Sequence, residues 1–180
     1  MPEGPVKGPW SGSWQFRRVP LPQPVLGHST VLRPYLTVTL RNGEKEFSTL
    51  ALVDTGADFN MLPREVAEVL GVDVERLSGP ALPFSGATAG GKAKPCTLKV
   101  EVVGRGESLG FENPFLIILN PAEGKARDVL IGRHPLFHDF DFGFRMGFTD
   151  DPEIGKFTMN RVTKRRDASR FVRHDPLIRP

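Results

Sequence analysis

The chain has 180 residues and a formal net charge of +3. This length suits one domain with a substantial core, and so small a charge gives no argument for binding nucleic acid. The single cysteine excludes a disulfide framework within the chain and is typical of a reducing compartment. The N-terminus lacks the features of a signal peptide, and no apolar run is long enough to span a bilayer. We therefore expect a cytoplasmic protein that does not enter a membrane.

Seventeen prolines and nineteen glycines predict many short strands and turns rather than long helices. Asn42-Gly43 is typical of a hairpin turn between two strands. One main helix is expected after Pro63, whose ring suits a first helical turn, and Gly71 would end it. Strands are expected over 31–40, 47–53, 98–103, 111–119, 129–132 and 156–162, and one helical turn over 135–138.

The two ends of the chain differ in composition from the middle. Residues 1–27 are rich in proline and glycine and predict an extended N-terminal arm, in which a short strand over 13–18 could pack on the body. Residues 163–180 carry a surplus of arginine and lysine and predict a basic tail, so the folded domain would span 28–162. The tail could contact nucleic acid or an acidic partner. Since no platform of aromatic and basic residues accompanies it, nucleic acid is not the expected partner, and we expect a solvated end.

The most informative stretch is the apolar, β-prone run 50–53, which ends abruptly in Asp54-Thr55-Gly56. The run predicts a buried strand because it offers almost no polar face, and Gly56 permits a sharp turn. A carboxylate fixed at the end of a buried strand costs free energy unless it is hydrogen-bonded or has a chemical task. Asp54 is therefore the leading candidate for a functional residue.

Three segments in this order resemble the retropepsin-like (retroviral-type) aspartic proteases, namely 52–58, the glycine-rich stretch 84–91, and 130–133. The resemblance covers roughly residues 31 to 144. It implies a mainly β fold, a closed β-barrel protomer with one main helix. Because the chain has a single Asp-Thr-Gly, it also implies an active site formed at a homodimer interface. The implied activity is that of an aspartic endopeptidase acting on peptide or protein substrates, with no cofactor and no metal ion.

The resemblance also implies roles for single residues. Asp54, Thr55 and Gly56 would be catalytic, with Thr55 bonded across the dimer axis and Gly56 offering its backbone to substrate. Gly132 and Arg133 would support the Asp54 loop. The substrate-binding residues implied in the same way are Ala57, Asp58, Met61, Phe84, Gly86, Gly90 and Leu130.

Two of these implications carry further detail. Residues 84–91 resemble the flap, a glycine-rich hairpin that closes over substrate, although an ordinary flexible loop stays an alternative. Asp58 and Arg133 would form a buried bidentate pair, and a purely structural salt bridge is the alternative. This sequence departs from the family at Asn60, where Ser or Thr is usual, and at Phe59, where some members are polar.

Other side chains have competing interpretations. Leu130 and Met61 could be plain core residues. His134 and His138 would share one face of a helix and could bind a metal, but the intervening proline and the lack of a further histidine nearby argue against it. Cys96 is expected to be a small core thiol rather than a reactive one.

A second class of function also stays open. The same fold could serve as a dimeric binding or assembly module with little or no peptidase activity. The intact Asp54-Thr55-Gly56 argues against this alternative, because a pure scaffold has no need of a costly pair of carboxylates.

Overall fold

The computed structural model describes residues 11–85, 90–104, 108–120, 128–134, 136–145 and 155–162. These residues form twelve strands and two short helices, so the fold is mainly β, as predicted. No helix within these ranges is long and apolar enough to cross a membrane.

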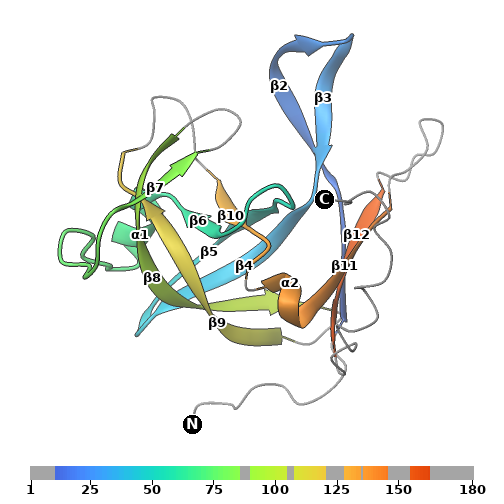
Figure 1. The fold of residues 1–180 in the computed structure, drawn as a ribbon. Helices are drawn as coiled ribbons and strands as arrows, with labels where there is room; N and C mark the ends of the chain where they lie inside the picture. The colour runs from blue at the N-terminus through green and yellow to red at the C-terminus, as the bar shows by residue number, and fades with distance from the viewer. Residues whose placement is uncertain are drawn as a thin grey trace, which may run out of the picture.

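Six strands close into a barrel (Figure 1). Each strand is hydrogen-bonded to the next, and the last pairs back with the first. Closure leaves the barrel without an unpaired edge and confirms the predicted closed architecture. In spatial order the strands are β4 (Tyr35–Asn42), β5 (Lys45–Val53), β10 (Val129–Ile131), β6 (Asn60–Leu62), β9 (Ser108–Ile118) and β8 (Gly90–Val103).

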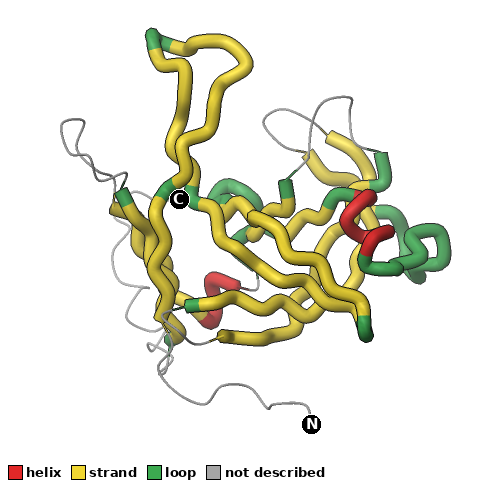
Figure 2. The backbone as a smooth tube through the Cα atoms, turned by 180° about the vertical axis from the view of Figure 1, so that it is seen from behind, coloured by secondary structure: helices red, strands yellow, loops and turns green. Residues whose placement is uncertain are grey.

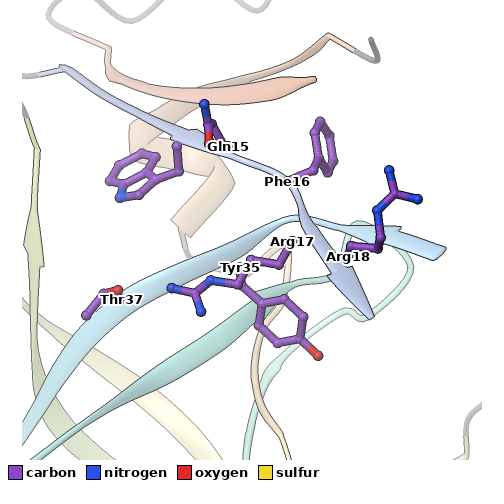
Figure 3. A pocket seen from close by; sticks show the side chains of 7 residues that line it. Gln15, Phe16, Arg17, Arg18, Tyr35 and Thr37 are labelled. Atoms are coloured by element: carbon purple, nitrogen blue, oxygen red, sulfur yellow. The ribbon is translucent and has the colours of Figure 1, made fainter. Parts of the chain in front are cut away.

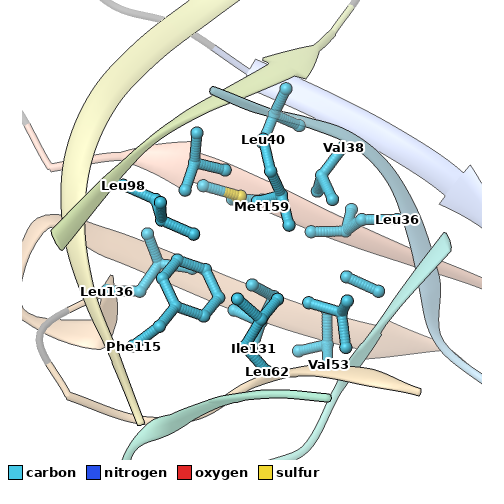
Figure 4. Close-up of a cluster of buried hydrophobic side chains, with 14 of the residues drawn as sticks. Leu36, Val38, Leu40, Val53, Leu62, Leu98, Phe115, Ile131, Leu136 and Met159 are labelled. Atoms are coloured by element: carbon cyan, nitrogen blue, oxygen red, sulfur yellow. The ribbon is translucent and has the colours of Figure 1, made fainter. Parts of the chain in front are cut away.

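Alternating apolar side chains fill the barrel (Figure 4). On β4, Leu36, Val38 and Leu40 are buried, while Thr37 between them is exposed. This period of two is what a strand with one face on the core requires. Among the larger side chains that share this core are Val53, Leu62, Leu98, Phe115, Ile131, Leu136 and Met159.

Local signals in the sequence correctly placed the β4–β5 hairpin and the helix. Strands β4 and β5 pair through Asn42 and Lys45, and Gly43 in the turn has a positive φ of 60°. Helix α1 (Arg64–Val69) begins directly after Pro63. It buries Ala67 against the barrel, and the chain turns away at Gly71. The predicted single turn near 135–138 corresponds to α2 (Leu136–Asp139).

A second sheet packs beside the barrel and contains β1 (Ser11–Gln15), β12 (Lys156–Arg161) and β11 (Phe140–Arg145), in that order. Aromatic rings join its strands: the ring centroids of Trp14 and Phe157 lie 5.5 Å apart, and Phe16 contacts Phe157 at 5.8 Å. Part of the predicted N-terminal arm is therefore built into the folded body. The domain boundaries after residues 27 and 162 stay predictions.

The third sheet is a hairpin of β2 (Arg17–Val25) and β3 (His28–Arg33) that stands out from the body (Figures 1 and 2). The prediction of one strand over 31–40 is wrong, because Pro34 separates β3 from β4. Proline has no N–H for a ladder, and the Pro34 carbonyl instead accepts a hydrogen bond from the Val53 amide at 2.9 Å. The chain thus changes direction at Pro34, from the hairpin into the barrel.

Candidate active site

Strand β5 delivers Asp54 to one end of the barrel, and backbone groups fix it there. The Asp54 amide donates to the Ile131 carbonyl at 2.9 Å. The Gly56 amide donates to the Asp54 carboxylate oxygen Oδ1, also at 2.9 Å. Asp54 itself is half-buried, whereas Thr55 and Gly56 are exposed. The loop therefore holds the Asp54 carboxylate by a hydrogen bond next to solvent-exposed residues.

A second loop, 132–134, lies against the first because β10 runs parallel to β5 and both strands end at the same side. The Arg133 amide donates to the Ala57 carbonyl at 2.9 Å, and the His134 amide donates to the Asp58 carbonyl at 2.7 Å. These two bonds tie the loops together through their backbones, so their relative position does not depend on flexible side chains.

Gly132 is required by the space available to it. A Cβ atom at this position would lie 2.4 Å from the carbonyl oxygen of Phe59, which is closer than real Cβ contacts. The backbone of the 54–59 loop can therefore approach this strand end only because residue 132 has no side chain.

Asn60 links both loops to the barrel and was not among the predicted site residues. Its side chain is fully buried. The oxygen Oδ1 accepts from the Gly132 amide at 3.0 Å, and Nδ2 donates to the Pro114 carbonyl at 2.9 Å. The signal in the sequence was a polar residue at the start of the otherwise apolar strand β6, since a buried amide needs hydrogen-bonding partners.

The expected buried, bidentate pair of Asp58 and Arg133 is wrong for the single chain. The two residues form an ion pair through one contact, Arg133 Nη2 to Asp58 Oδ1, and their side chains are 55% and 69% exposed for Arg133 and Asp58 respectively. Both residues belong to loops at the open end of the barrel, where water reaches them. An exposed pair of this kind contributes little to stability.

An aromatic pair lies on the same two loops. The ring of Phe59 is half-exposed, and it meets the His134 imidazole edge-on with centroids 5.9 Å apart. Phe59 therefore leaves an apolar ring exposed beside an imidazole at this end of the barrel.

Met61 and Leu130 are opposite partners on the antiparallel strands β6 and β10. Neither belongs to the central core cluster, whereas Leu62, Val129 and Ile131 beside them do. Because successive side chains in a strand point to opposite faces, Met61 and Leu130 lie on the face turned away from that core. Leu130 is half-buried and Met61 is buried. Their predicted role in substrate pockets stays a prediction.

The glycine-rich segment forms a hairpin, in which β7 (Leu82–Ser85) pairs with the first residues of β8. Gly91 faces Phe84 and Gly90 faces Ser85. A Cβ at Gly90 would lie 3.2 Å from the Phe84 carbonyl oxygen, and one at Gly91 would lie 3.0 Å from the Phe84 ring. The hairpin rises at the end of the barrel that carries the β5–β6 loop (Figures 1 and 2). Residues 86–89, and with them the predicted Gly86, lie outside the described residues.

Burial raises the pKa values of two groups outside the Asp54 and 132–134 loops. Burial is the main cause that raises the pKa of the Tyr35 hydroxyl, and the hydrogen bond to Asp128 is the second cause. The hydroxyl donates this bond to Asp128 Oδ2 at 2.8 Å. Burial also raises the pKa of the Cys96 thiol to about 11, the opposite of what a reactive cysteine needs.

Among the described side chains no three His, Cys, Asp or Glu gather as a metal site. The predicted alternative involving His138 cannot be placed, since that side chain is outside the described set.

A groove of about 510 Å³ lies between β4 and the junction of β1 with β2 (Figure 3). None of the predicted site residues lines it. It is lined by Trp14, Gln15, Phe16, Arg17, Arg18, Tyr35 and Thr37.

Comparison with known proteins decides the family. A family model described as aspartyl protease matches residues 36–134, which is more than half of the chain. The chain belongs to the aspartyl protease family. The match includes the Asp54 loop, the β7–β8 hairpin and the 132–134 loop, the three segments on which the sequence resemblance depended. No curated protein matches the chain by sequence.

Three solved structures are similar to this aspartyl protease family member. A retropepsin-like aspartic protease from Rickettsia conorii is 25% identical, with a TM-score of 0.51, and the match covers 86% of this chain and 94% of that one. The retroviral protease-like domain of Ddi1 from Leishmania major is 20% identical, with a TM-score of 0.41 and coverage of 62% and 81%. EIAV protease with the inhibitor HBY-793 is 20% identical, with a TM-score of 0.31 and coverage of 59% and 86%. The fold is retropepsin-like, as predicted.

Proposed function

We propose that the chain is an aspartic endopeptidase that hydrolyses peptide bonds with a water molecule activated by two Asp54 carboxylates, one from each chain of a homodimer. The observation that carries this proposal is the placement of Asp54. Its carboxylate accepts the Gly56 amide at 2.9 Å at the end of a closed barrel, beside exposed Thr55 and Gly56. Membership of the aspartyl protease family supports it.

The chemistry needs two such carboxylates, and one chain supplies one Asp-Thr-Gly. Two facing carboxylates share a proton because like charges so close cannot both ionise. The ionised Asp54 takes a proton from water, whose oxygen bonds to the substrate carbonyl carbon. The protonated Asp54 of the other chain donates a hydrogen bond from its carboxyl O–H to the substrate carbonyl oxygen. The C–N bond then breaks as a proton passes to the leaving nitrogen, and the titration belongs to the pair.

The residues around Asp54 take the remaining tasks in this proposal. Thr55 hydrogen-bonds across the dimer axis, and Gly56 offers its exposed backbone to substrate. Ala57 and Asp58 bind the substrate backbone next to it, and Arg133 orients Asp58 through their ion pair. The side chains that line pockets or close over the peptide are Met61, Leu130, Phe84, Gly86 and Gly90.

The flap assignment is supported by the close packing of the hairpin. Glycines at 90 and 91 let the β8 strand lie close against Phe84, where a side chain would be tightly packed, and a glycine-rich hairpin can move to admit and enclose a peptide. The proposed place of action is the cytoplasm, for which the single cysteine is the argument.

A mixed peptide library incubated from about pH 3 to about pH 8, around the pKa of roughly 4 of a free Asp, tests the activity. Wild type is compared with Asp54→Asn at matched dimer content. We expect cleavage by wild type alone, with a pH dependence set by a carboxylate pair and no effect of chelators. A folded, dimeric wild type that cleaves nothing would contradict the proposal and favour the dimeric binding or assembly module.

A further inference from the structure

The hairpin of β2 and β3 is a separate two-stranded sheet. Its two strands pair only with each other in the described part of the chain, and it projects away from the barrel in both views (Figures 1 and 2). An isolated two-stranded hairpin is marginally stable in water. A long projecting hairpin therefore calls for a contact that the described part of the chain does not provide.

The tip of the hairpin exposes apolar side chains in a strained turn. Leu26 is 94% exposed and Val25 is 53% exposed. Leu26 has a φ of +49° and Gly27 a φ of +81°, so both central turn residues are left-handed, a geometry that favours Asn, Asp or Gly. A leucine here is unfavourable both for the backbone and for water, and such outliers mark functional contacts.

The two outer edges of the hairpin differ in whether a further strand can pair with them. Prolines at 20, 22 and 24 recur at every second position of β2. Pro20 has no N–H to donate to β3, where its partner is Thr30, and successive amides of a strand point to opposite edges, so the Pro20 nitrogen faces the outer edge. The register shifts between Pro20 and Val25, and this irregular stretch contains the other two prolines. Strand β3 has no proline. Strand addition is therefore blocked at the β2 edge and open at the β3 edge.

The base of the hairpin adjoins the candidate active site. Pro34, which follows β3, accepts the Val53 amide at 2.9 Å, one residue before Asp54. If two Asp54 loops meet, the second chain must arrive beside this base. A second copy placed there would lie next to the base of the hairpin.

We propose that the β2–β3 hairpin is the dimerisation arm, which contacts a second copy of this chain through the outer edge of β3 and the tip formed by Val25 and Leu26. The inference rests on the proposed function, because the two-chain site supplies the second copy. It adds to that function the segment that holds the two chains together.

Three variants test the arm. Leu26→Asn removes the apolar tip and relieves the turn, so we expect a more stable monomer but a weaker dimer. Thr30→Pro places a proline opposite Pro20, with its nitrogen on the free edge of β3. Arg18→Pro is the matched control on the blocked edge of β2. Both proline variants lose the same exposed hydrogen bond, Arg18 Nη1 to Thr30 Oγ1 at 3.3 Å.

Sedimentation of the full chain at several concentrations gives the dimer dissociation constant, and circular dichroism gives folding. We expect Leu26→Asn and Thr30→Pro to raise that constant by about tenfold or more, and Arg18→Pro to leave it near the wild-type value. Peptide cleavage by the first two should fall at low protein concentration and recover at high concentration, because the Asp54 loop is intact.

The outcomes separate the two proposals. Dimerisation through the arm without any peptide cleavage would contradict the proposed function alone. Cleavage by wild type, with folded Leu26→Asn and Thr30→Pro dimerising as tightly as wild type, would overturn the arm alone. Variants that stay dimeric but lose cleavage of folded proteins while cutting short peptides would overturn it too, since the arm would then bind substrate.

Discussion

Asn60 accepts a hydrogen bond from the Gly132 amide through its side-chain oxygen, at 3.0 Å and out of reach of solvent. The same side chain donates to the Pro114 carbonyl. One buried amide thus connects the strand that follows the Asp54 loop, the loop after β10, and strand β9. We infer that Asn60 sets the position of both loops without contacting substrate.

Asn60→Ala should destabilise the fold by about 1 to 3 kcal/mol, because it leaves the buried Gly132 amide without its acceptor. Urea unfolding measures this loss, and peptide cleavage should fall as the loops shift. Asn42→Ala is a suitable control, since Asn42 also donates to a backbone carbonyl, that of Leu70, but far from the loops. Full activity in a destabilised Asn60→Ala would show that the residue does not position the site.

Gly132→Ala should be more harmful than a glycine substitution in an open place. The added Cβ would meet the Phe59 backbone at 2.4 Å, whereas one at Gly110 in β9 has nothing within 4 Å. We expect Gly132→Ala to cost about 2 to 3 kcal/mol through overpacking and to lower activity. Gly110→Ala should be neutral or slightly stabilising. Equal unfolding midpoints for the two variants would contradict the close approach of the loops.

Cys96 should be inert toward thiol reagents in the native protein. Its pKa is raised by burial to about 11, so at pH 8 the thiolate fraction is about a hundredfold below that of an ordinary thiol. Reaction with a disulfide reagent should be slow in buffer and fast in urea, and it should speed up as the pH rises toward 11. Rapid native labelling at pH 8 would show that the thiol is accessible and ionised.

Much of the fold could be predicted because its signals are local. The apolar run before Asp54, the Asn42-Gly43 turn and the helix after Pro63 depend on a few neighbouring residues. Closure of the barrel by β4 and β8 depends on pairing between distant segments, and the sequence pattern did not predict which strands pair. The continuous strand expected across Pro34 is wrong because the alternation around that residue hides the effect of its missing N–H.

The candidate site likewise contains some features that could be predicted from the sequence and others that could not. Asp54 could be singled out from a local signal, the apolar run that ends at it. Gly132 was implied by the family resemblance, because the close approach that requires a glycine there is to Phe59, which is distant in sequence. Asn60 was not assigned to the site, because its partners Gly132 and Pro114 are 72 and 54 residues away in sequence. The exposure of the Asp58–Arg133 pair depends on where the loops lie on the finished barrel, which residue types alone do not give.

The central claim is that one active site needs Asp54 from two chains, and subunit mixing tests it most directly. Wild type is mixed with a ninefold excess of Asp54→Asn, the chains are allowed to exchange, and peptide cleavage per wild-type chain is measured. The account predicts that activity falls to about a tenth, because most wild-type chains then pair with an Asp54→Asn chain, whose amide cannot share the proton. Undiminished activity per wild-type chain, with exchange shown by mass spectrometry of the mixed dimers, would contradict it.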